Sequence, residues 1–279
     1  MSIPRKIRCT VESITDHGGR VYTVDLVPAN SVPSFRPGQF LHLTVDDYDP
    51  SSFWPESRVF SIASSPRDRS RIRICYSVKG RYTTKMEQVL RPGSSVWIKL
   101  PYGEFIIDDT NGALLVAGGT GISAFTAFIG TFMPEIPEKI TLVYGARTPE
   151  LLLFQEMILD QFAKVARLNV IFFTETPDDG FFGRMAALPR APACFVGRIS
   201  IDTVLRQLST ALCPPTSVVG SAASDLRPLI SGPRPPPPVL CSPTSVFYLA
   251  GPPVMISALS AGLRTCGVGT ERIRVDAWE

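Results

Sequence analysis

The N-terminal part of the chain alternates short apolar blocks with turn residues. The blocks are rich in β-branched residues, and tripeptides such as Arg36-Pro37-Gly38 and Arg91-Pro92-Gly93 separate them. Strands are expected at Ile7–Ile14, Val21–Val27, Phe40–Val45, Phe60–Ala63, Ile72–Val78 and Val96–Leu100. This succession of short strands predicts an antiparallel six-stranded β-barrel, interrupted by one helix at Thr83–Leu90.

From Ala113 onward, apolar strands alternate with helical stretches. The strands are expected at Leu114–Ala117, Ile140–Tyr144, Val170–Thr174 and Val246–Ala250, and the clearest helices at Pro149–Lys164 and Pro253–Gly267. The alternation predicts βαβ units and a parallel sheet with both faces covered. The expected fold class is therefore two domains: a β-barrel over residues 1–109 and an α/β domain with a parallel sheet over residues 110–279.

A segment rich in proline, serine and glycine interrupts the second domain near residues 213–244. It includes an unbroken proline run, Pro235–Pro238. We interpret it as an extended insertion or loop. A plain solvated loop is favoured over a proline ligand for a partner domain, because such segments are commonly linkers.

The stretch from Asn111 to Thr131 has the pattern of a strand, a glycine loop and a helix. Gly118–Gly121 is GGTG, and a helix is expected to begin near Thr120. Glycines let the backbone approach a ligand, and a helix N-terminus directs N–H groups at a phosphate, so a nucleotide site is predicted. An ordinary buried strand–turn–helix unit is the alternative, because neither GxGxxG nor GK[ST] is present. Ligands bind beyond the carboxyl ends of parallel strands, so one crevice is expected to be lined by the residues that follow strand ends, Gly118, Gly145, Glu175 and Gly251.

The same region raises a membrane alternative. Residues Ala113–Met133 carry no charge and are about long enough to cross a bilayer. Three glycines in the middle, together with many Ala, Thr and Ser residues, argue against it. No transmembrane segment is therefore expected.

Composition narrows the function classes. Apolar residues make up 44% of the 279 residues, as in globular proteins, and a net charge of +3 is too small to argue for nucleic acid as a partner. The whole positive excess lies before residue 110. Six scattered cysteines without CxxC spacing, and only two histidines, make an iron–sulfur cluster or another metal site unexpected. The N-terminus has no apolar signal segment, so a cytoplasmic location is the expectation.

The block Arg58-Val59-Phe60-Ser61 carries the clearest chemistry. An aromatic side chain on a strand can lie against a planar ring, and a serine hydroxyl can hydrogen-bond a ring nitrogen. Arg58 shares a strand face with Phe60 and can supply charge for a phosphate. The alternative is a buried strand with one arginine that extends to solvent.

This block resembles the RxYS or RxFS flavin motif of the ferredoxin–NADP+ reductase superfamily. Other blocks are similar to that family's segments and follow its order: FRPGQF (35–40), KGRYTTKM (79–86), LRPGSSVWIKLPYGEF (90–105), LLVAGGTGISAF (114–125), LVYGARTPELLLF (142–154) and FYLAGPPVM (247–255). The resemblance covers nearly the whole chain apart from the insertions. It implies an FAD-binding barrel followed by an NAD(P)-binding α/β domain.

The resemblance also implies roles for the flavin side. Arg58, Val59, Phe60 and Ser61 would bind the cofactor, with Arg58 at a flavin phosphate, Phe60 stacked on the isoalloxazine and Ser61 as the catalytic residue near flavin N5. Gly80, Thr83 and Thr84 would hold the pyrophosphate, which favours FAD over FMN. Tyr76 would contact the ribose or a phosphate, although an ordinary strand position fits it equally well.

On the nucleotide side, Gly119, Thr120 and Gly121 would receive the diphosphate of the nicotinamide nucleotide. Gly251 and Pro252 would let the nicotinamide reach the flavin. The chain departs from the family pattern in three places: Ala250 replaces a common cysteine, a Gly-Arg segment occurs twice (Gly183-Arg184 and Gly197-Arg198), and the chain ends in Asp276-Ala277-Trp278-Glu279. Trp278 is either close to the flavin or part of ordinary packing.

The acidic run after the third strand favours NADH. NADP-dependent relatives often have Ser and Arg there, whereas Glu175, Asp178 and Asp179 would repel a 2′-phosphate and could bind a free ribose diol. Arg147 could clamp a phosphate, so NADPH stays possible.

The expected function is an NAD(P)H-dependent flavin oxidoreductase that accepts a hydride from NADH and passes electrons to a separate acceptor. The acceptor could be an iron–sulfur protein, an oxygenase component, free flavin or a quinone. The alternative is an electron-transfer or regulatory flavoprotein subunit that works only within a larger complex.

Alternating arginines at positions 67, 69, 71 and 73 would share a face if they form one strand. A charge-protected sheet edge is favoured there over a docking site for an acidic acceptor.

Overall fold

The computed structural model describes residues 3–107, 112–133, 135–136, 138–210 and 245–276, without the side chains of residues 206–210. The expected domain boundary at residue 109, the proline-rich segment near residues 213–244 and Trp278 lie outside these ranges.

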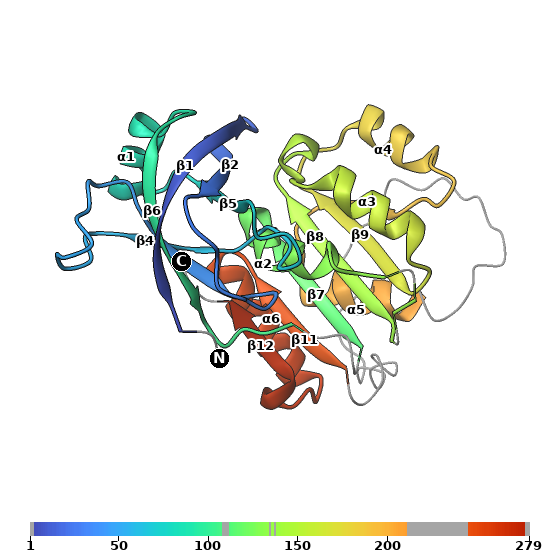
Figure 1. The fold of residues 1–279 in the computed structure, drawn as a ribbon. Coiled ribbons are helices and arrows are strands. Elements are labelled where there is room, and N and C mark those ends of the chain that lie inside the picture. The colour runs from blue at the N-terminus through green and yellow to red at the C-terminus, as the bar shows by residue number, and fades with distance from the viewer. Residues whose placement is uncertain (1–2, 108–111, 134, 137, 211–244, 277–279) are drawn as a thin grey trace.

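Antiparallel strands form the first sheet (Figure 1). They are β1 (Arg5–Asp16), β2 (Val21–Pro28), β3 (Phe40–Thr44), β4 (Arg58–Ser61), β5 (Ile72–Ser77) and β6 (Ser95–Tyr102). Their order is β4-β3-β6-β1-β2-β5. Just beyond β4, the N–H of Ala63 donates to the carbonyl of Arg73 in β5 at 2.9 Å, which links the two edges of the sheet. The predicted antiparallel, near-closed six-stranded barrel is confirmed.

Alternating side chains fill the barrel. In β1, Ile7, Cys9 and Val11 are buried while the residues between them are exposed, as the two-residue period of a strand requires. Helix α1 (Arg81–Val89) packs on the same core through Tyr82 and Met86, which lie four residues apart on one helix face. The helix expected at Thr83–Leu90 is therefore present and begins two residues earlier.

Parallel strands form the second sheet, in the order β10-β9-β8-β7-β11-β12. They are β7 (Ala113–Gly118), β8 (Ile140–Ala146), β9 (Leu168–Thr174), β10 (Ala193–Val196), β11 (Val246–Ala250) and β12 (Ile273–Asp276). Every residue of β7 is buried, because helices lie on both faces of this central strand. The predicted parallel α/β sheet is confirmed.

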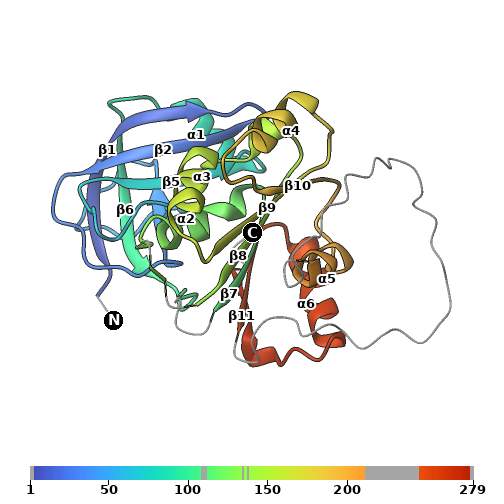
Figure 2. The ribbon, with the colours of Figure 1, turned by 90° about the vertical axis from the view of Figure 1, so that its right-hand side faces the viewer.

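Helices cover the second sheet in two layers (Figure 2). Helices α2 (Ser123–Ile129) and α3 (Gln155–Lys164) lie on the side of the barrel, and α5 (Ile201–Thr210) and α6 (Pro253–Thr265) lie on the other side. Helix α4 (Asp179–Ala186) follows β9. Single 3₁₀ turns complete the structure: η1 (Gly119–Ile122), η2 (Pro149–Leu151) and η3 (Thr270–Arg272). Val21 and Cys75 of the barrel belong to the same buried cluster as α2 and α3, so the two halves share a core.

Several elements differ from the sequence expectation. β10, β12, α4 and α5 were not expected. The helix expected over Pro149–Lys164 is broken into η2 and α3, because the buried Tyr144 hydroxyl donates to the Leu151 carbonyl (3.1 Å) and accepts from the Leu153 N–H (2.9 Å). The helix expected near Thr120 begins at Ser123, after η1.

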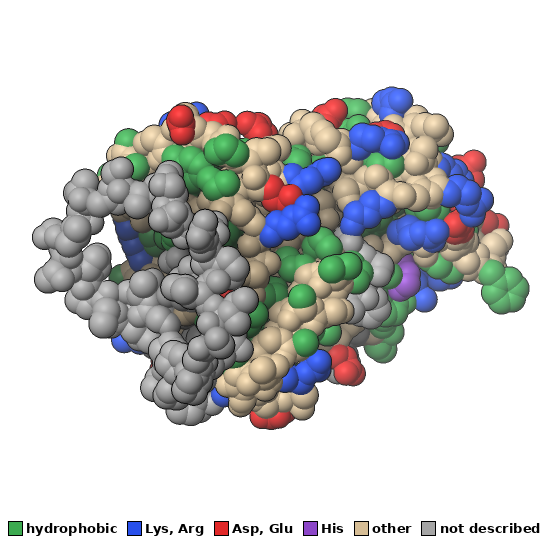
Figure 3. All heavy atoms as spheres, turned by 180° about the vertical axis from the view of Figure 1, so that it is seen from behind, with side chains coloured by type: hydrophobic (Ala, Val, Ile, Leu, Met, Phe, Trp, Pro, Cys, Tyr) green, Lys and Arg blue, Asp and Glu red, His purple; other side chains and the backbone are tan. Residues whose placement is uncertain are grey.

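The alternating arginines do not share one strand face. Only Arg73 lies in β5, where its Nε is 2.7 Å from Asp25 Oδ1. Arg71 pairs with Glu12 at 2.6 Å, and the Arg67 guanidinium lies 3.5 Å from the Met133 sulfur. β5 is an edge strand of its hydrogen-bonded sheet, and two of the four arginines, Arg71 and Arg73, are paired with carboxylates. On the rear face, Lys and Arg side chains gather over the half of the molecule formed by the barrel (Figure 3).

Among the helices that the structure describes, none is long and apolar enough to cross a bilayer; the uncharged stretch forms β7, η1 and α2. Four described cysteines are free thiols, namely Cys9, Cys75, Cys194 and Cys266. Within the same ranges, no three His, Cys, Asp or Glu side chains gather in a way that could hold a metal ion.

Candidate functional site

A cavity of about 360 Å³ lies where the barrel, the start of α1 and the carboxyl-terminal side of the parallel sheet meet. This volume is within the usual range for small-molecule sites. Its lining consists of all of β4, residues 75–77 of β5, residues 79–83 at the start of α1, and Thr120, Gly121, Ser123, Gly251 and Asp276. Residues from both halves of the chain therefore face one space.

Phe60 provides an aromatic wall of this cavity. Its ring is half-buried, packs on the barrel core and lies 6.2 Å from the ring of Tyr76 at an interplanar angle of 59°. Tyr76 in turn stacks on Tyr22, with ring centroids 5.3 Å apart. Burial raises the pKa of Tyr76, so its hydroxyl stays protonated at neutral pH. These contacts fix the Phe60 ring in place without a ligand.

Ser61 is held by a residue from the far end of the chain. Its Oγ donates to Oδ2 of Asp276 at 3.0 Å, which connects the end of β4 to the end of β12. Asp276 is 9% exposed. The sequence analysis missed this residue, because only the pairing of β12 beside β11 brings it to the cavity. A second link between the halves is the bond from Thr126 Oγ1 to the Ala63 carbonyl, at 2.8 Å.

The start of α1 forms the polar end of the cavity. Thr83 Oγ1 accepts from the backbone N–H groups of Lys79 (3.0 Å) and Gly80 (3.1 Å), which fixes the turn into the helix. The first N–H groups of a helix have no intrahelical acceptor and favour an anion. Thr84 does not line the cavity; its N–H donates to the Gly80 carbonyl.

Two arginines flank this helix start. Arg58 and Arg81 both bind the carboxylate of Glu56, at 3.2 Å and 2.9 Å. The Arg58 guanidinium also lies 4.8 Å from the centre of the Tyr82 ring. The contacts with Glu56 and Tyr82 hold the Arg58 guanidinium beside the α1 N-terminus, and Glu56 also holds that of Arg81.

Two glycines of the loops have a structural reason as well as a possible ligand role. A Cβ on Gly121 would lie 2.5 Å from the carbonyl group of Ala250, and one on Gly251 would lie 2.9 Å from the backbone of Gly118. Only glycine lets the ends of β7 and β11 approach this closely. Gly119 has φ +53° with open space around it, and neither Gly119 nor Pro252 lines the cavity.

The expected single crevice along the sheet is only partly present. Gly251 lines the cavity and Gly118 packs beside it, whereas Gly145 packs on Ile199 and Glu175 lies elsewhere. Arg147 is also outside the cavity: its side chain is exposed and lies next to the Gly18–Gly19 turn.

Two carboxylates of the acidic run after β9 are bound by other groups of the protein. Glu175 pairs with Arg198 at 3.0 Å. Asp178 caps α4 by accepting from the Phe181 N–H at 2.7 Å, so its carboxylate serves the helix. Arg198 is the basic group of the second Gly-Arg segment, and the structure places it at the same end of the sheet as Glu175.

The cavity also includes residues that the sequence analysis did not single out. Arg81 and Tyr82 belong to a block whose glycine and threonines were named, whereas no sequence signal marks Cys75, Ser77 or Ser123. Burial raises the pKa of the Cys75 thiol to about 12, so it is unreactive at neutral pH.

Comparisons with known proteins agree with this arrangement. Residues 115–187 match the family of oxidoreductase NAD-binding domains. The chain is 35% identical over 150 residues to the probable dihydroorotate dehydrogenase B (NAD(+)), electron transfer subunit, of Methanocaldococcus jannaschii, a match that covers 53% of this chain and 49% of that protein. It is 31% identical over 128 residues to reductase component 1 of terephthalate 1,2-dioxygenase from Comamonas sp., covering 44% of this chain and 36% of that protein. The chain thus spans about half or less of the length of these relatives.

Among solved structures, a ferredoxin NADP+ reductase from Neisseria gonorrhoeae with bound FAD and NADP superposes with a TM-score of 0.68. The match covers 99% of both chains at 13% sequence identity. The two proteins therefore share the fold over their full length.

Proposed function

We propose that this chain, which has the fold of the ferredoxin–NADP+ reductase superfamily, is an FAD-dependent NAD(P)H oxidoreductase. It takes a hydride from NADH and passes electrons to a separate acceptor. The observation that carries the proposal is the single cavity that gathers β4, the start of α1 and the loops after β7 and β11.

The residues present fit FAD. The fixed aromatic face of Phe60 and the Ser61 hydroxyl suit the isoalloxazine, and the side chains of the described residues leave a cavity beside Phe60. The α1 N-terminus with Gly80, Thr83 and Arg58 suits a pyrophosphate. When bound, FAD supplies the site that accepts a hydride and stores two electrons.

The chain's own residues provide orientation. Asp276 fixes the Ser61 hydroxyl, so this group would already be oriented when a flavin binds. Gly121 and Gly251 keep side chains out of the opposite wall, which leaves room for a nicotinamide. Thr120 and the backbone of η1 would receive the nucleotide diphosphate. Ala250 precedes Gly251, so no thiol is supplied at this position, and Ser61 would contribute a hydroxyl on the flavin side.

We assign NADH as the preferred nucleotide. Glu175 follows β9, where a dinucleotide ribose binds in sheets of this type, and a carboxylate there accepts from a ribose diol and repels a 2′-phosphate. Arg198 reduces that repulsion through its ion pair with Glu175. Arg147 adds a second cation just after β8, where its carbonyl accepts from the Thr176 N–H at 3.1 Å. NADPH use at a lower rate is therefore expected.

The decisive experiment is the visible spectrum of the purified chain with and without NADH under anaerobic conditions. A flavin spectrum that bleaches on NADH addition supports both cofactors at once. A colourless protein that takes up neither FAD nor FMN on reconstitution would overturn the proposal. Parallel titration with NADPH measures the nucleotide preference.

A second candidate is a subunit that transfers electrons only within a larger complex. It is favoured by the M. jannaschii relative, whose name describes an electron transfer subunit. NADH-dependent reduction of ferricyanide by the isolated chain separates the two. Turnover supports the autonomous reductase, whereas flavin reduction without turnover supports the subunit.

A further inference from the structure

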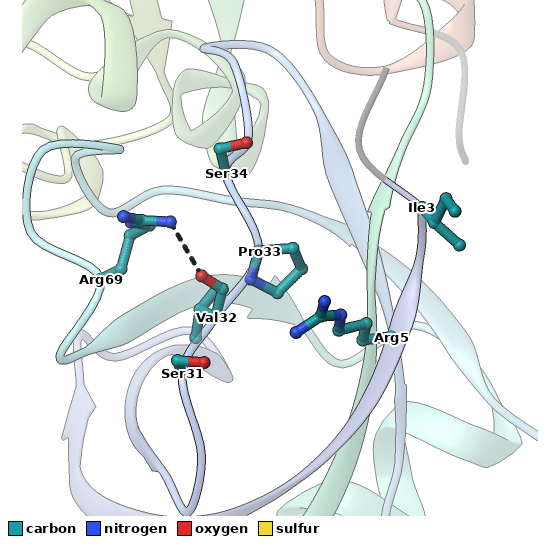
Figure 4. A pocket seen from close by; sticks show the side chains of 7 residues that line it. All are labelled: Ile3, Arg5, Ser31, Val32, Pro33, Ser34 and Arg69. Carbon is teal, nitrogen blue, oxygen red and sulfur yellow. Dashed lines mark hydrogen bonds between the residues drawn. The ribbon is translucent and has the colours of Figure 1, made fainter.

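A second hollow, of about 630 Å³, lies on the barrel away from the first cavity. Figure 4 shows its lining: the segment 31–34 between β2 and β3, Ile3 and Arg5 at the start of β1, and Arg69 from the loop before β5. The two cavities share no lining residue. In Figure 1, the N-terminus lies at the bottom of the barrel half and α1 at its top.

Two guanidinium groups face this hollow. The segment 31–34 runs between Arg69 and Arg5 (Figure 4). One Nη of Arg69 donates to the Val32 carbonyl at 3.0 Å, which anchors this guanidinium to the wall and leaves its other N–H donors available. Figure 4 draws no hydrogen bond from the Arg5 guanidinium to the other lining side chains or to the segment 31–34.

No acid balances these charges among the residues that line the hollow. The acid next to Arg69 is Asp68, and its carboxylate is bound to the N–H (3.0 Å) and hydroxyl (2.6 Å) of Ser70. The neighbouring arginines behave differently, because Arg71 and Arg73 each have an acidic partner. Arg5 and Arg69 therefore face the hollow without an acidic partner among its lining residues.

The remaining lining is apolar or hydroxylic. Val32 is buried beneath the hollow, Pro33 is half-buried, and Ile3 is 82% exposed. An isoleucine left in water gains free energy when an apolar group covers it. Ser31 adds a hydroxyl at the rim.

We propose that this hollow binds a small organic anion, whose carboxylate or phosphate head lies over the 31–34 segment that separates Arg5 from Arg69 and whose apolar body lies against Ile3 and Pro33. Guanidinium groups bind such heads through paired, charge-assisted hydrogen bonds. The site is independent of the flavin and nucleotide, so its occupancy does not require the proposed function to hold.

The test is a titration of the purified full chain, followed by amide NMR shifts or calorimetry, with acetate, hexanoate and inorganic phosphate at low, constant ionic strength. We expect saturable binding of hexanoate and phosphate, with hexanoate tighter than acetate because of its apolar chain. Arg5→Gln and Arg69→Gln should each weaken hexanoate binding about tenfold, the loss of one charge-assisted contact.

The matched control is Arg36→Gln. Arg36 is exposed and lies two residues beyond the segment, but it does not line the hollow. Arg5→Gln removes no contact that holds the fold, so it reports on binding even if Arg69→Gln disturbs the Val32 segment. Equal weakening by Arg36→Gln, or hexanoate binding unchanged in Arg5→Gln, would overturn the proposal. Release of bound flavin by hexanoate would also contradict it, since the two sites are separate.

Discussion

The Ser61–Asp276 hydrogen bond is the contact on which the proposed chemistry depends most directly. It joins the two sheets at the cavity and holds a hydroxyl at a defined position. We expect Ser61→Ala to slow flavin reduction by NADH about tenfold to a hundredfold, the effect of losing one oriented hydrogen bond. The flavin should stay bound, because Phe60, Arg58 and the α1 N-terminus are untouched. Stopped-flow reduction measures the rate.

Two variants of Asp276 separate its charge from its hydrogen bond. Asn keeps an oxygen that accepts from Ser61, whereas Ala removes the acceptor. If Asp276 acts by positioning Ser61, Asp276→Asn should reduce flavin at nearly the parent rate and Asp276→Ala should resemble Ser61→Ala. Similar rates for Asp276→Asn and Asp276→Ala would instead assign the effect to the carboxylate charge.

Glu175 is the residue expected to set the nucleotide preference. In Glu175→Gln the carboxylate charge is lost and Arg198 is released from its ion pair. Attraction then replaces repulsion at a 2′-phosphate, so the ratio of kcat/KM for NADPH to that for NADH should rise about tenfold. Asp178→Asn is the control, because Asp178 serves as the cap of α4 and its side chain is engaged there. A ratio unchanged in Glu175→Gln would place the ribose elsewhere.

At the scale of elements, a strong hydrophobic periodicity predicted strands and helices correctly, whereas short or weakly periodic elements were not predicted. The barrel strands and the buried strands β7, β8, β9 and β11 follow their apolar runs closely. β12 is only four residues long and carries Arg274 and Asp276, so its sequence gives no strand signal; pairing with β11 creates it. The acids that begin α4 were interpreted as a nucleotide-specificity signal, although Asp178 is a helix cap. The break before α3 depends on the Tyr144 hydroxyl, which comes from the preceding strand β8 and binds the Leu151 carbonyl and the Leu153 N–H only in the folded chain.

The glycine loop between β7 and α2 is where sequence interpretation was ambiguous between binding and packing. The structure supports a packing role for Gly121, because its missing Cβ makes room for the backbone of Ala250. Gly121→Ala should therefore destabilise the protein by about 2 kcal/mol, a typical cost of overpacking against backbone. Urea unfolding measures this change.

Gly183→Ala is the matched control for that prediction. Gly183 lies within α4, and a Cβ there would meet nothing within 4 Å. Alanine is the better helix former, so this variant should be neutral or more stable by up to about 1 kcal/mol. If both variants behaved alike, the close approach of β7 and β11 would not be the reason for glycine at position 121.

At the scale of the whole molecule, the two sheets are one packed body. Residues of the barrel share a buried cluster with α2 and α3, and the Thr126–Ala63 and Ser61–Asp276 bonds cross between the halves. A change that stabilises or destabilises one half should therefore shift a single unfolding transition that includes both halves. The two histidines allow this to be tested, since both belong to the barrel half: His17 follows β1 and His42 lies in β3.

Burial lowers the pKa of both histidines from 6.5, and Lys99 adds to the effect at His42, while Asp16 partly opposes it at His17. The unfolded chain therefore takes up protons at a higher pH than the folded protein does. The contribution of the two histidines to the free energy of unfolding should be fully present above pH 6.5. It should fall as the pH drops below that value, towards the lowered folded pKa values. Asp49, Asp68 and Glu87, whose pKa values are also lowered, act in the same direction only below about pH 4.5, so the two windows are distinct.

Urea midpoints between pH 5 and pH 7.5, followed by circular dichroism of the whole chain, should show one transition that shifts with pH. The double variant His17→Gln/His42→Gln should flatten this dependence; a second transition that ignores pH would mean that the parallel sheet unfolds independently of the barrel.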